Sequence, residues 1–542
     1  MSTIKTTKFS PILKFLGLCM LVNLTHYSLL GQIEFKHSAT GSFIAEHGFT
    51  YQLQSTDSLA IDTEWTNFGQ PILGTGQSIE FNQYTDQDHR FFRVHKEGKS
   101  VLTDNHKEII QNKLKEFSEL LELPGISVGV QLNQDKKWTT AVGVADLASG
   151  EALTPEHTFR IGSATKSFVA MTVIQLIKQR ATYNFQGIEL PLTVSSPVYT
   201  LLDNEYLDIF TAEGVRLYDF ESMTVRQLLD HTSGIMNFTN ADDWVTSYIT
   251  ARDRPYTSKE LLKVASDYEQ VVRNANPEYS VHPGSQWIYS NTNYILLGLI
   301  VETITGQPIG KEIEDRWIKP LGLTSTHYLL GGQLDIPGEH AKGYENWHNW
   351  TSYAYGDMLA PLDFDIDVTA FETSAVGASG CITSNIDDLL TWGHTLGNAE
   401  DHIGKQYHQG HINYRFFNHA HLPSYNGYGL GIAHEANVSY NADYFSIGHR
   451  GQVSGYDVAV LYLPDLKVTI AVMTNRTLLK PNPDAPKDYP LPQTVNFIHE
   501  FIVNTLFPDY IQANTIQPGE SPVPLNIEHQ RYEESRGLTA TY

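Results

Sequence analysis

The chain has 542 residues, of which 41% are hydrophobic and 18% are charged, and its formal net charge is -24 at pH 7. A chain of this length can bury a large core and is expected to form more than one domain. The acidic balance, with no run of basic residues, excludes a nucleic-acid-binding surface, because binding to phosphates requires a basic patch.

Residues 1–31 have the pattern of a secretory signal peptide. Three lysines precede an apolar stretch from Phe15 to Leu24, and small residues follow near Ser28 and Gly31. The apolar stretch is too short to cross a bilayer. We therefore expect a secreted or periplasmic protein with no stable membrane insertion after the signal is cleaved. A lipid anchor at Cys19 and an uncleaved signal anchor are the alternatives.

Residues 32–98 are expected to form a small all-β domain. Alternating apolar and polar residues at 48–55, 78–81 and 90–94 predict strands, with turn residues between them. An aromatic such as Trp65 could contact carbohydrate, and the domain could instead contact another protein. Core packing is the more common role of such a side chain.

Residues 105–508 are expected to form one α+β domain. The pattern predicts an antiparallel sheet flanked by helices, plus a helical subdomain in the middle of the domain, with a site in the cleft between them. The expected elements are a helix at 106–122, strands at 125–132, 138–144, 457–463 and 467–473, and a last helix at 493–506. Residues 509–542 are polar, and we expect a loose tail there.

Ser163-Ala164-Thr165-Lys166 carries the clearest chemical signal in the chain. Residues i and i+3 of a helix share a face, so this spacing places an amine beside a hydroxyl. At the start of a helix, unpaired backbone N–H groups and the positive dipole end are also available. A desolvated neutral lysine can take the proton of a serine and make its hydroxyl a nucleophile. The alternative is an exposed helix start with no chemical role.

Two further segments carry groups suited to the same chemistry. Tyr289-Ser290-Asn291 precedes an apolar helical run; its phenol can relay a proton, and its amide can hold a substrate carbonyl. Gly448-His449-Arg450-Gly451-Gln452 opens a strand-like stretch, in which glycine lets a substrate backbone approach the strand edge. The alternative is that Tyr289 and His449 are structural side chains.

Taken together, the three motifs resemble the serine β-lactamase and penicillin-binding-protein superfamily. Ser-x-x-Lys, Tyr-x-Asn and His-x-Gly occur in the order typical of its class C branch, which includes DD-peptidases, D-amino-acid-specific amidohydrolases and esterases. Class C β-lactamases have Lys-Thr-Gly at the third motif, so His449-Arg450-Gly451 is more similar to the DD-peptidases and esterases. Supporting stretches similar to this branch lie at 228–235, 283–285, 378–384 and 428–431.

The resemblance implies acyl transfer in two steps. Ser163 would attack a carbonyl after passing its proton to Lys166 or Tyr289, and Tyr289 would protonate the leaving group. Backbone N–H groups of Ser163 and Gln452 would bind the oxyanion, and such donors typically contribute about 3 kcal/mol each to the transition state. Asn291 would hold the amide carbonyl of the substrate.

The third motif leaves more than one role open. The resemblance implies that His449 polarises Tyr289 or binds the substrate, with Gly451 beside the oxyanion site. Arg450 could grip a substrate carboxylate through two parallel hydrogen bonds, or it could point away and pair with a surface acid. We expect no cofactor and no metal, because no histidines have the His-Glu-x-x-His spacing and no glycine-rich phosphate loop follows a strand.

The sequence therefore predicts a serine hydrolase that forms an acyl-enzyme with a small-molecule or peptide substrate. The favoured activity is that of a D-stereospecific peptidase or amidohydrolase, similar to a DD-carboxypeptidase. A carboxylesterase with the same site is the alternative, and a β-lactamase is less favoured. A non-catalytic binding protein with the same fold is opposed by the intact Ser163, Lys166 and Tyr289.

Overall fold

The computed structural model describes the chain in two compact units. One unit contains the described residues up to Glu108 together with those from Val503 onward, and the other runs from Ile109 to Ile502. The expected signal peptide, Trp65 and most of the expected tail lie outside the described residues. Described are residues 33–35, 38–44, 50–56, 66–67, 72–73, 78–84, 90–97, 102–132, 136–276, 279, 281–329, 331–346, 365–405, 408, 415–416, 425–435, 446–477 and 494–513.

Antiparallel strands make up the described N-terminal part of the first unit. One sheet has the order β1-β7-β3-β4, with β5 also paired to β3, and β2 pairs with β6. The three strands expected from the alternating pattern correspond to β3, β6 and β7. The bounds are β1 (Ile33–Phe35), β2 (Ser38–Ile44), β3 (Thr50–Thr56), β4 (Thr66–Asn67), β5 (Ile72–Leu73), β6 (Ser78–Tyr84) and β7 (Arg90–Glu97).

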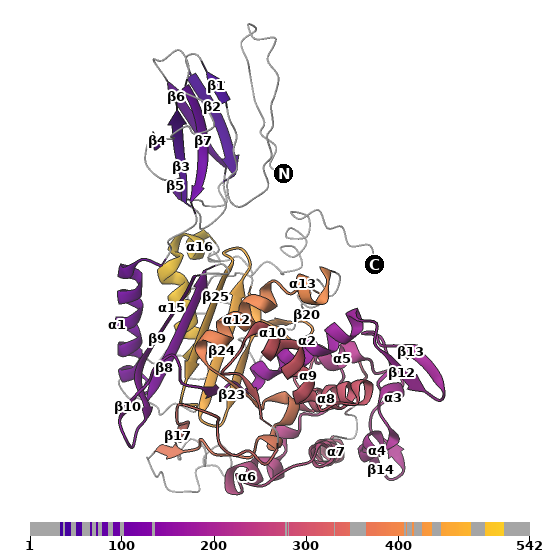
Figure 1. Ribbon diagram of the computed structural model, residues 1–542. Coiled ribbons are helices and arrows are strands. Elements are labelled where there is room, and N and C mark those ends of the chain that lie inside the picture. The colour runs from indigo at the N-terminus through magenta and orange to yellow at the C-terminus, as the bar shows by residue number, and fades with distance from the viewer. Residues whose placement is uncertain are drawn as a thin grey trace. The chain divides into compact units, whose positions relative to one another are not determined.

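A nine-stranded antiparallel sheet forms the centre of the second unit (Figure 1). Its order is β10-β9-β8-β25-β24-β23-β22-β21-β20, so a strand from the start of the unit pairs with one from its end. Strands β8, β24 and β25 are buried along their whole length, including the polar side chains of Ser127 and Gln131 in β8. The bounds are β8 (Gly125–Leu132), β9 (Lys136–Asp146), β10 (Glu151–Ala152), β20 (Arg415–Phe416), β21 (Tyr425–Tyr428), β22 (Ala433–Glu435), β23 (Ile447–Val453), β24 (Tyr456–Leu463) and β25 (Val468–Thr474).

Helices cover both faces of this sheet (Figure 1). Helix α1 (Asp104–Leu120) lies on the face that carries Thr140, whose hydroxyl accepts a hydrogen bond from Gln111 at 2.9 Å. Helix α15 (Thr494–Leu506) contacts α1 through an edge-to-face pair of phenylalanine rings. Helix α12 (Ile386–Gly397) packs on the opposite face, where a Cβ on Gly129 would lie only 2.7 Å from a methyl group of Leu390.

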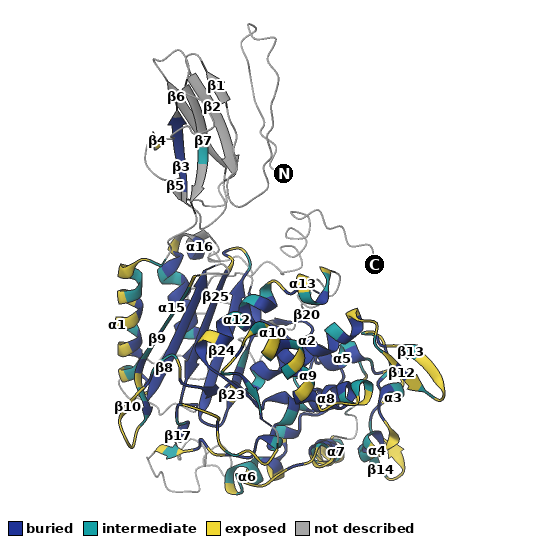
Figure 2. Ribbon diagram, in the orientation of Figure 1, coloured by how far each residue is buried: buried dark blue, intermediate teal, exposed yellow. Residues whose placement is uncertain are grey.

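A helical subdomain lies between β11 (Phe159–Arg160) and α12 in the sequence. Two of its helices, α2 (Thr165–Lys178) and α8 (Asn291–Thr305), are apolar on most sides and are buried over much of their length, as Figure 2 shows. Its other helices include α5 (Val225–Leu229), α6 (Asp242–Thr250), α7 (Ser258–Ala275) and α9 (Ile309–Ile313), and its short strands include β17 (Tyr344–Asn346) and β18 (Asp365–Asp367).

The expected α+β fold, with a helix-flanked antiparallel sheet and a helical subdomain, is confirmed. Helix α1 covers most of the helix expected at 106–122. Helix α15 begins one residue later than the helix expected at 493–506 and ends at the same residue. Helix α16 (Pro508–Ala513) occupies the beginning of the expected tail, because Tyr510 and Ile511 are buried. Among the described residues, no helix is both long and apolar enough to span a bilayer.

Candidate active site

Ser163 lies in a 3₁₀ turn, Gly162–Ala164, directly before α2. Gly162 adopts a φ of 49°, a conformation that glycine takes without steric cost. Lys166 follows one helical turn later; its Nζ lies 2.9 Å from Ser163 Oγ and donates a hydrogen bond to the Ser379 carbonyl at 2.8 Å. The i to i+3 spacing therefore does bring the amine and the hydroxyl into hydrogen-bonding distance.

The amine of Lys166 is removed from water. Its side chain is 0% exposed, and the rings of Tyr289 and Tyr294 lie 5.0 and 5.5 Å from Nζ. Burial lowers the pKa of Lys166 well below its usual range, because an ammonium ion loses its hydration in this position. Ser163 is partly exposed, so a substrate can reach the hydroxyl while the amine beside it stays dry.

Side-chain contacts fix the start of α2. The Thr165 hydroxyl accepts a hydrogen bond from the Ile382 N–H at 3.1 Å, and the Ser167 hydroxyl accepts one from the Trp392 indole at 2.8 Å. The ring of Phe168 also stacks on Trp392, with 3.7 Å between centroids. These contacts set the rotation of the helix and hence the direction of the lysine side chain.

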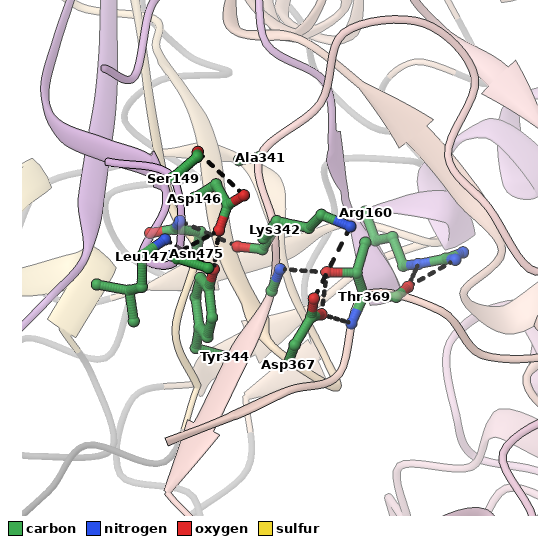
Figure 3. A network of polar contacts seen from close by, with 12 residues as sticks. Asp146, Leu147, Ser149, Arg160, Ala341, Lys342, Tyr344, Asp367, Thr369 and Asn475 are labelled. Carbon is green, nitrogen blue, oxygen red and sulfur yellow. Dashed lines mark hydrogen bonds and ion pairs between the residues drawn. The ribbon is translucent and has the colours of Figure 1, made fainter. Parts of the chain in front are cut away.

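A buried arginine holds the strand that leads to Ser163. Arg160 is 2% exposed, and its Nη2 donates to the carbonyls of Leu334 at 2.6 Å and Thr369 at 3.0 Å. The Thr369 N–H in turn donates to the carboxylate of Asp367 at 2.9 Å, within the polar network of Figure 3. These bonds tie the backbone just before the nucleophile to the segments of Leu334 and Thr369, and the Nη1 group has no hydrogen-bond partner among the described residues.

Tyr289, Ser290 and Asn291 form the turn that begins α8, with Ser290 at the N-cap. The Asn291 N–H donates to the side-chain oxygen of Asn237 at 3.1 Å, and its Nδ2 donates to the hydroxyl of Thr239 at 3.1 Å. These two bonds fix the orientation of the Asn291 amide. The ring of Tyr289 lies over the buried amine of the first motif, so two of the three motifs meet here.

Strand β23 brings the third motif against the serine turn. A Cβ on Gly162 would lie 2.8 Å from the backbone nitrogen of Gln452, and one on Gly451 would lie 1.7 Å from the carbonyl oxygen of Ile161. Neither position has room for a side chain, so the two glycines allow the backbones to meet. The Gln452 backbone therefore lies beside the turn of Ser163, as an oxyanion site built from both residues requires.

The His449 imidazole is 0% exposed and is bonded away from Tyr289. Its Nδ1 donates to the Arg450 carbonyl, so its Nε2 accepts the bond from the Tyr428 hydroxyl at 2.8 Å. Burial, reinforced by the nearby Lys166 amine, lowers the pKa of His449 to about 3. His449 is therefore neutral, and its direct polar contacts are Tyr428 and its own strand.

Arg450 points to the other face of the sheet. Alternation along β23 places His449 and Gly451 on the face of the serine turn, and Arg450 on the face of Asp457. The Arg450 Nη2 lies 3.7 Å from the Asp457 carboxylate, and the two side chains are 11% and 7% exposed. Burial raises the pKa of Asp457 to about 6, against the opposing effect of the guanidinium. Of the two expected alternatives, this geometry corresponds to pairing with an acid, which is buried.

Sequence reasoning did not assign a role to His231, Tyr294 or Tyr428. His231 lies 4.4 Å from the ring of Tyr289, and the Tyr294 ring lies above the Lys166 amine. Two of these residues fall in stretches that carried the family resemblance, at 228–235 and 428–431. That resemblance was the available signal, but no chemical rule assigned a role to these side chains from the sequence alone.

The arrangement can perform nucleophilic acyl transfer. It combines a partly exposed hydroxyl, an amine that burial makes a base, and two adjoining backbones able to donate to an oxyanion. Within the part of the chain that the structure describes, no cluster of three His, Cys, Asp or Glu side chains could hold a metal ion.

The sequence is similar to a protein-family model and to curated proteins. The family model described as Beta-lactamase matches residues 110–492. A curated relative, the unguisins hydrolase of Aspergillus campestris, is 24% identical over 368 residues, which are 67% of this chain and 60% of the relative. The match thus spans less than two thirds of the length of that relative.

Two solved structures share the fold. The D-stereospecific amidohydrolase from Streptomyces sp. is 25% identical, with a TM-score of 0.53 over 68% of this chain and 94% of that chain. The D-amino acid amidase from Ochrobactrum anthropi is 20% identical, with a TM-score of 0.54 over 76% of this chain and 100% of that chain.

Proposed function

We propose that this chain, which belongs to the β-lactamase family and is a serine hydrolase, acts as a D-stereospecific amidohydrolase. The proposed reaction forms an acyl-enzyme on Ser163. The observation that carries the proposal is the contact of 2.9 Å between Ser163 Oγ and the dry amine of Lys166. The likeness to a D-stereospecific amidohydrolase and the hydrolase relative support the reaction class.

In the proposed reaction, neutral Lys166 takes the Ser163 proton while Oγ forms a bond to the substrate carbonyl carbon. The negative charge moves to the carbonyl oxygen, which accepts hydrogen bonds from the N–H groups of Ser163 and Gln452. The C–N bond of the substrate then breaks, and the amine leaves with a proton delivered through Tyr289. Water hydrolyses the ester on Ser163 and returns the enzyme to its starting state.

The proposed substrates lack a carboxylate at the leaving group. Arg450, the cation of the third motif, lies on the other face of the sheet from the serine turn and pairs with Asp457. A substrate carboxylate would have to displace a buried ion pair to reach it, which carries a large desolvation cost. Amides and internal peptide bonds are therefore proposed over the DD-carboxypeptidase reaction that the third motif first suggested.

A substrate panel tests this function. D-phenylalanine amide, L-phenylalanine amide, a D-Ala-D-Ala peptide, a p-nitrophenyl ester and a chromogenic cephalosporin are each incubated with the wild type and with Ser163→Ala. We expect faster release from the D-amide than from the L-amide and the D-Ala-D-Ala peptide, and loss of all activity in the variant. Equal rates on the two amides would refute the stereospecificity, and activity surviving in the variant would refute the nucleophile.

A carboxylesterase is the second candidate, favoured by the same position of Arg450, because a simple ester also needs no cation at the leaving group. Hydrolysis of the p-nitrophenyl ester with no release from either amide would establish it. Hydrolysis of the cephalosporin would instead indicate the β-lactamase reaction, which the His449 motif makes the least expected of the three.

Secretion or periplasmic location forms part of the proposal and rests on the pattern of residues 1–31. N-terminal sequencing of the protein recovered from the medium or periplasm tests it. Cleavage near Ser28 or Gly31 is expected, and an intact N-terminus in the cytoplasm would exclude it. Contact of the N-terminal strands with carbohydrate or another protein also remains a proposal, and a pull-down on insoluble polysaccharides checks the first.

A further inference from the structure

We infer that His231 is a positioning residue for Tyr289, and this inference rests on the proposed role of Tyr289 in proton transfer. His231 is 0% exposed and follows helix α5. Its φ is 60°, a left-handed conformation that is sterically unfavourable for a residue with a side chain. This conformation closes α5 in a Schellman motif, in which the Thr232 N–H donates to the Gln227 carbonyl at 3.0 Å, so the position of His231 is fixed by the end of the helix.

His231 holds the chain on both sides of Tyr289. Its carbonyl accepts a hydrogen bond from the Ile288 N–H at 2.8 Å, and its ring Nδ1 accepts one from the Ser290 N–H at 3.1 Å. Its ring also packs on the Tyr289 ring, with 4.4 Å between centroids and 38° between planes. One residue thus fixes the backbone before Tyr289, the backbone after it and the ring itself.

The bond from Ser290 also fixes the tautomer of His231. Since Nδ1 accepts from a backbone N–H, the proton of the neutral ring is on Nε2. Nδ2 of Asn293, a second donor, lies 3.4 Å from the same Nδ1. Protonation of Nδ1 would place two donors face to face, so the contact with Ser290 requires a neutral imidazole.

The electrostatics of the site agree with this geometry. Burial lowers the pKa of His231 well below its usual range, and the Lys166 and His449 side chains lower it further. The Nε2 atom has no hydrogen-bond partner among the described residues. The Nε2 atom therefore makes no hydrogen bond that would require a histidine at this position. The hydrogen bond that Nδ1 accepts from Ser290 does account for the imidazole.

Two substitutions separate the acceptor from the backbone conformation. Asparagine and glycine both tolerate a positive φ, but only asparagine carries an acceptor the same number of bonds from the backbone as Nδ1. We expect His231→Asn, which keeps the acceptor but loses the ring that packs on Tyr289, to lower kcat on a p-nitrophenyl ester by no more than about 10-fold. We expect His231→Gly to lower kcat by about 100-fold with little change in KM, as displacing a catalytic group does.

Equal kcat values for the two variants would overturn the inference, since they would show that only the backbone conformation matters. Melting temperatures identify a variant that is unfolded at the assay temperature, and in that case kcat is compared at a lower temperature at which both variants are folded. The ester reports on the site even if the D-amides are not hydrolysed, so failure of the proposed stereospecificity is seen separately.

A double-mutant cycle tests whether His231 acts through Tyr289. If it does, His231→Gly should add little further loss of kcat in a Tyr289→Phe background, because the group that it positions has been removed. Losses that multiply would show that His231 acts by another route and would overturn the inference.

Discussion

Replacing Lys166 by methionine should separate catalysis from folding. The amine is fully buried and lies 2.9 Å from Ser163 Oγ, and methionine keeps an unbranched apolar stem of similar shape. If Ser163 gives its proton to this amine, Lys166→Met should lower kcat by about 10²- to 10⁴-fold. The same change should make the folded protein more stable, because a buried base is costly to keep.

The expected gain in stability follows from the burial of the amine. In the unfolded chain a lysine has a pKa of about 10.4, so an amine that is neutral at pH 7, as the proposed role of a base requires, costs about 4–5 kcal/mol at 1.36 kcal/mol per pH unit. Loss of the contact with Ser163 offsets about 1 kcal/mol, and leaving the Ser379 carbonyl unpaired offsets about 1–3 kcal/mol. Lys166→Met should therefore be more stable by up to about 3 kcal/mol at pH 7.

The pH dependence gives a sharper test. The pKa of Lys166 is lowered in the folded state, so its contribution to stability is full above about pH 10.4 and is lost as the pH falls toward the folded-state pKa. The wild type should gain about 3 kcal/mol from this group between pH 7 and 9.5, and the variant should gain none. Denaturant unfolding measures the free energy of unfolding of the wild type and of the variant at pH 7 and pH 9.5. The difference between the two proteins at each pH cancels the contributions of all other titrating groups. A constant difference would refute a neutral amine.

Two further substitutions test other parts of the site, and a third tests a buried acid outside it. Arg450→Ala should slow hydrolysis of D-phenylalanine amide and of a peptide with a free carboxylate by the same factor in kcat/KM, because its partner is Asp457; a larger loss on the carboxylate substrate would restore the clamp role. Gly451→Ala should lower kcat by about 100-fold, because its Cβ would overlap the Ile161 carbonyl and push the serine turn away, and an unchanged kcat would contradict this contact. Burial raises the pKa of Glu345 to about 7, so its contribution is full below about pH 4.5 and is lost as the pH rises through 7; Glu345→Gln should therefore reduce the fall in melting temperature between pH 5 and pH 8, and an equal fall would argue against this shift.

Local patterns predicted those parts of the site that depend on one element. Ser163 and Lys166 share a helix face whatever surrounds them, so their spacing in the sequence was sufficient. The central strands were predictable because continuous apolar runs indicate strands buried on both faces. The chemistry requires the Lys166 amine to be buried, but the sequence does not show that it is. The packing of α2 in the structure shows this burial.

The role of the third motif depends on tertiary pairing, which the sequence does not reveal. A shift of one residue in a strand reverses the face of every side chain, so the side of the sheet occupied by Arg450 follows from the register of β23 on β24. The partner of His449 is Tyr428, which two strand pairings bring near. The left-handed φ of His231 belongs to the local C-cap of α5, but the contacts of its ring with Ser290 and Tyr289 are tertiary, so the sequence does not reveal them.

The three buried basic side chains of the site explain how the proposed proton transfer can be reversible. Lys166 lowers the pKa of both His231 and His449, so a charge on any one of them disfavours charge on the others. When Lys166 takes the Ser163 proton, the new ammonium ion is dry, and both imidazole lone pairs nearby already accept hydrogen bonds. That ion is consequently a strong acid, and the leaving group becomes the favoured acceptor for its proton. The same desolvation that makes Lys166 a base in the first step thus makes it a proton donor in the second.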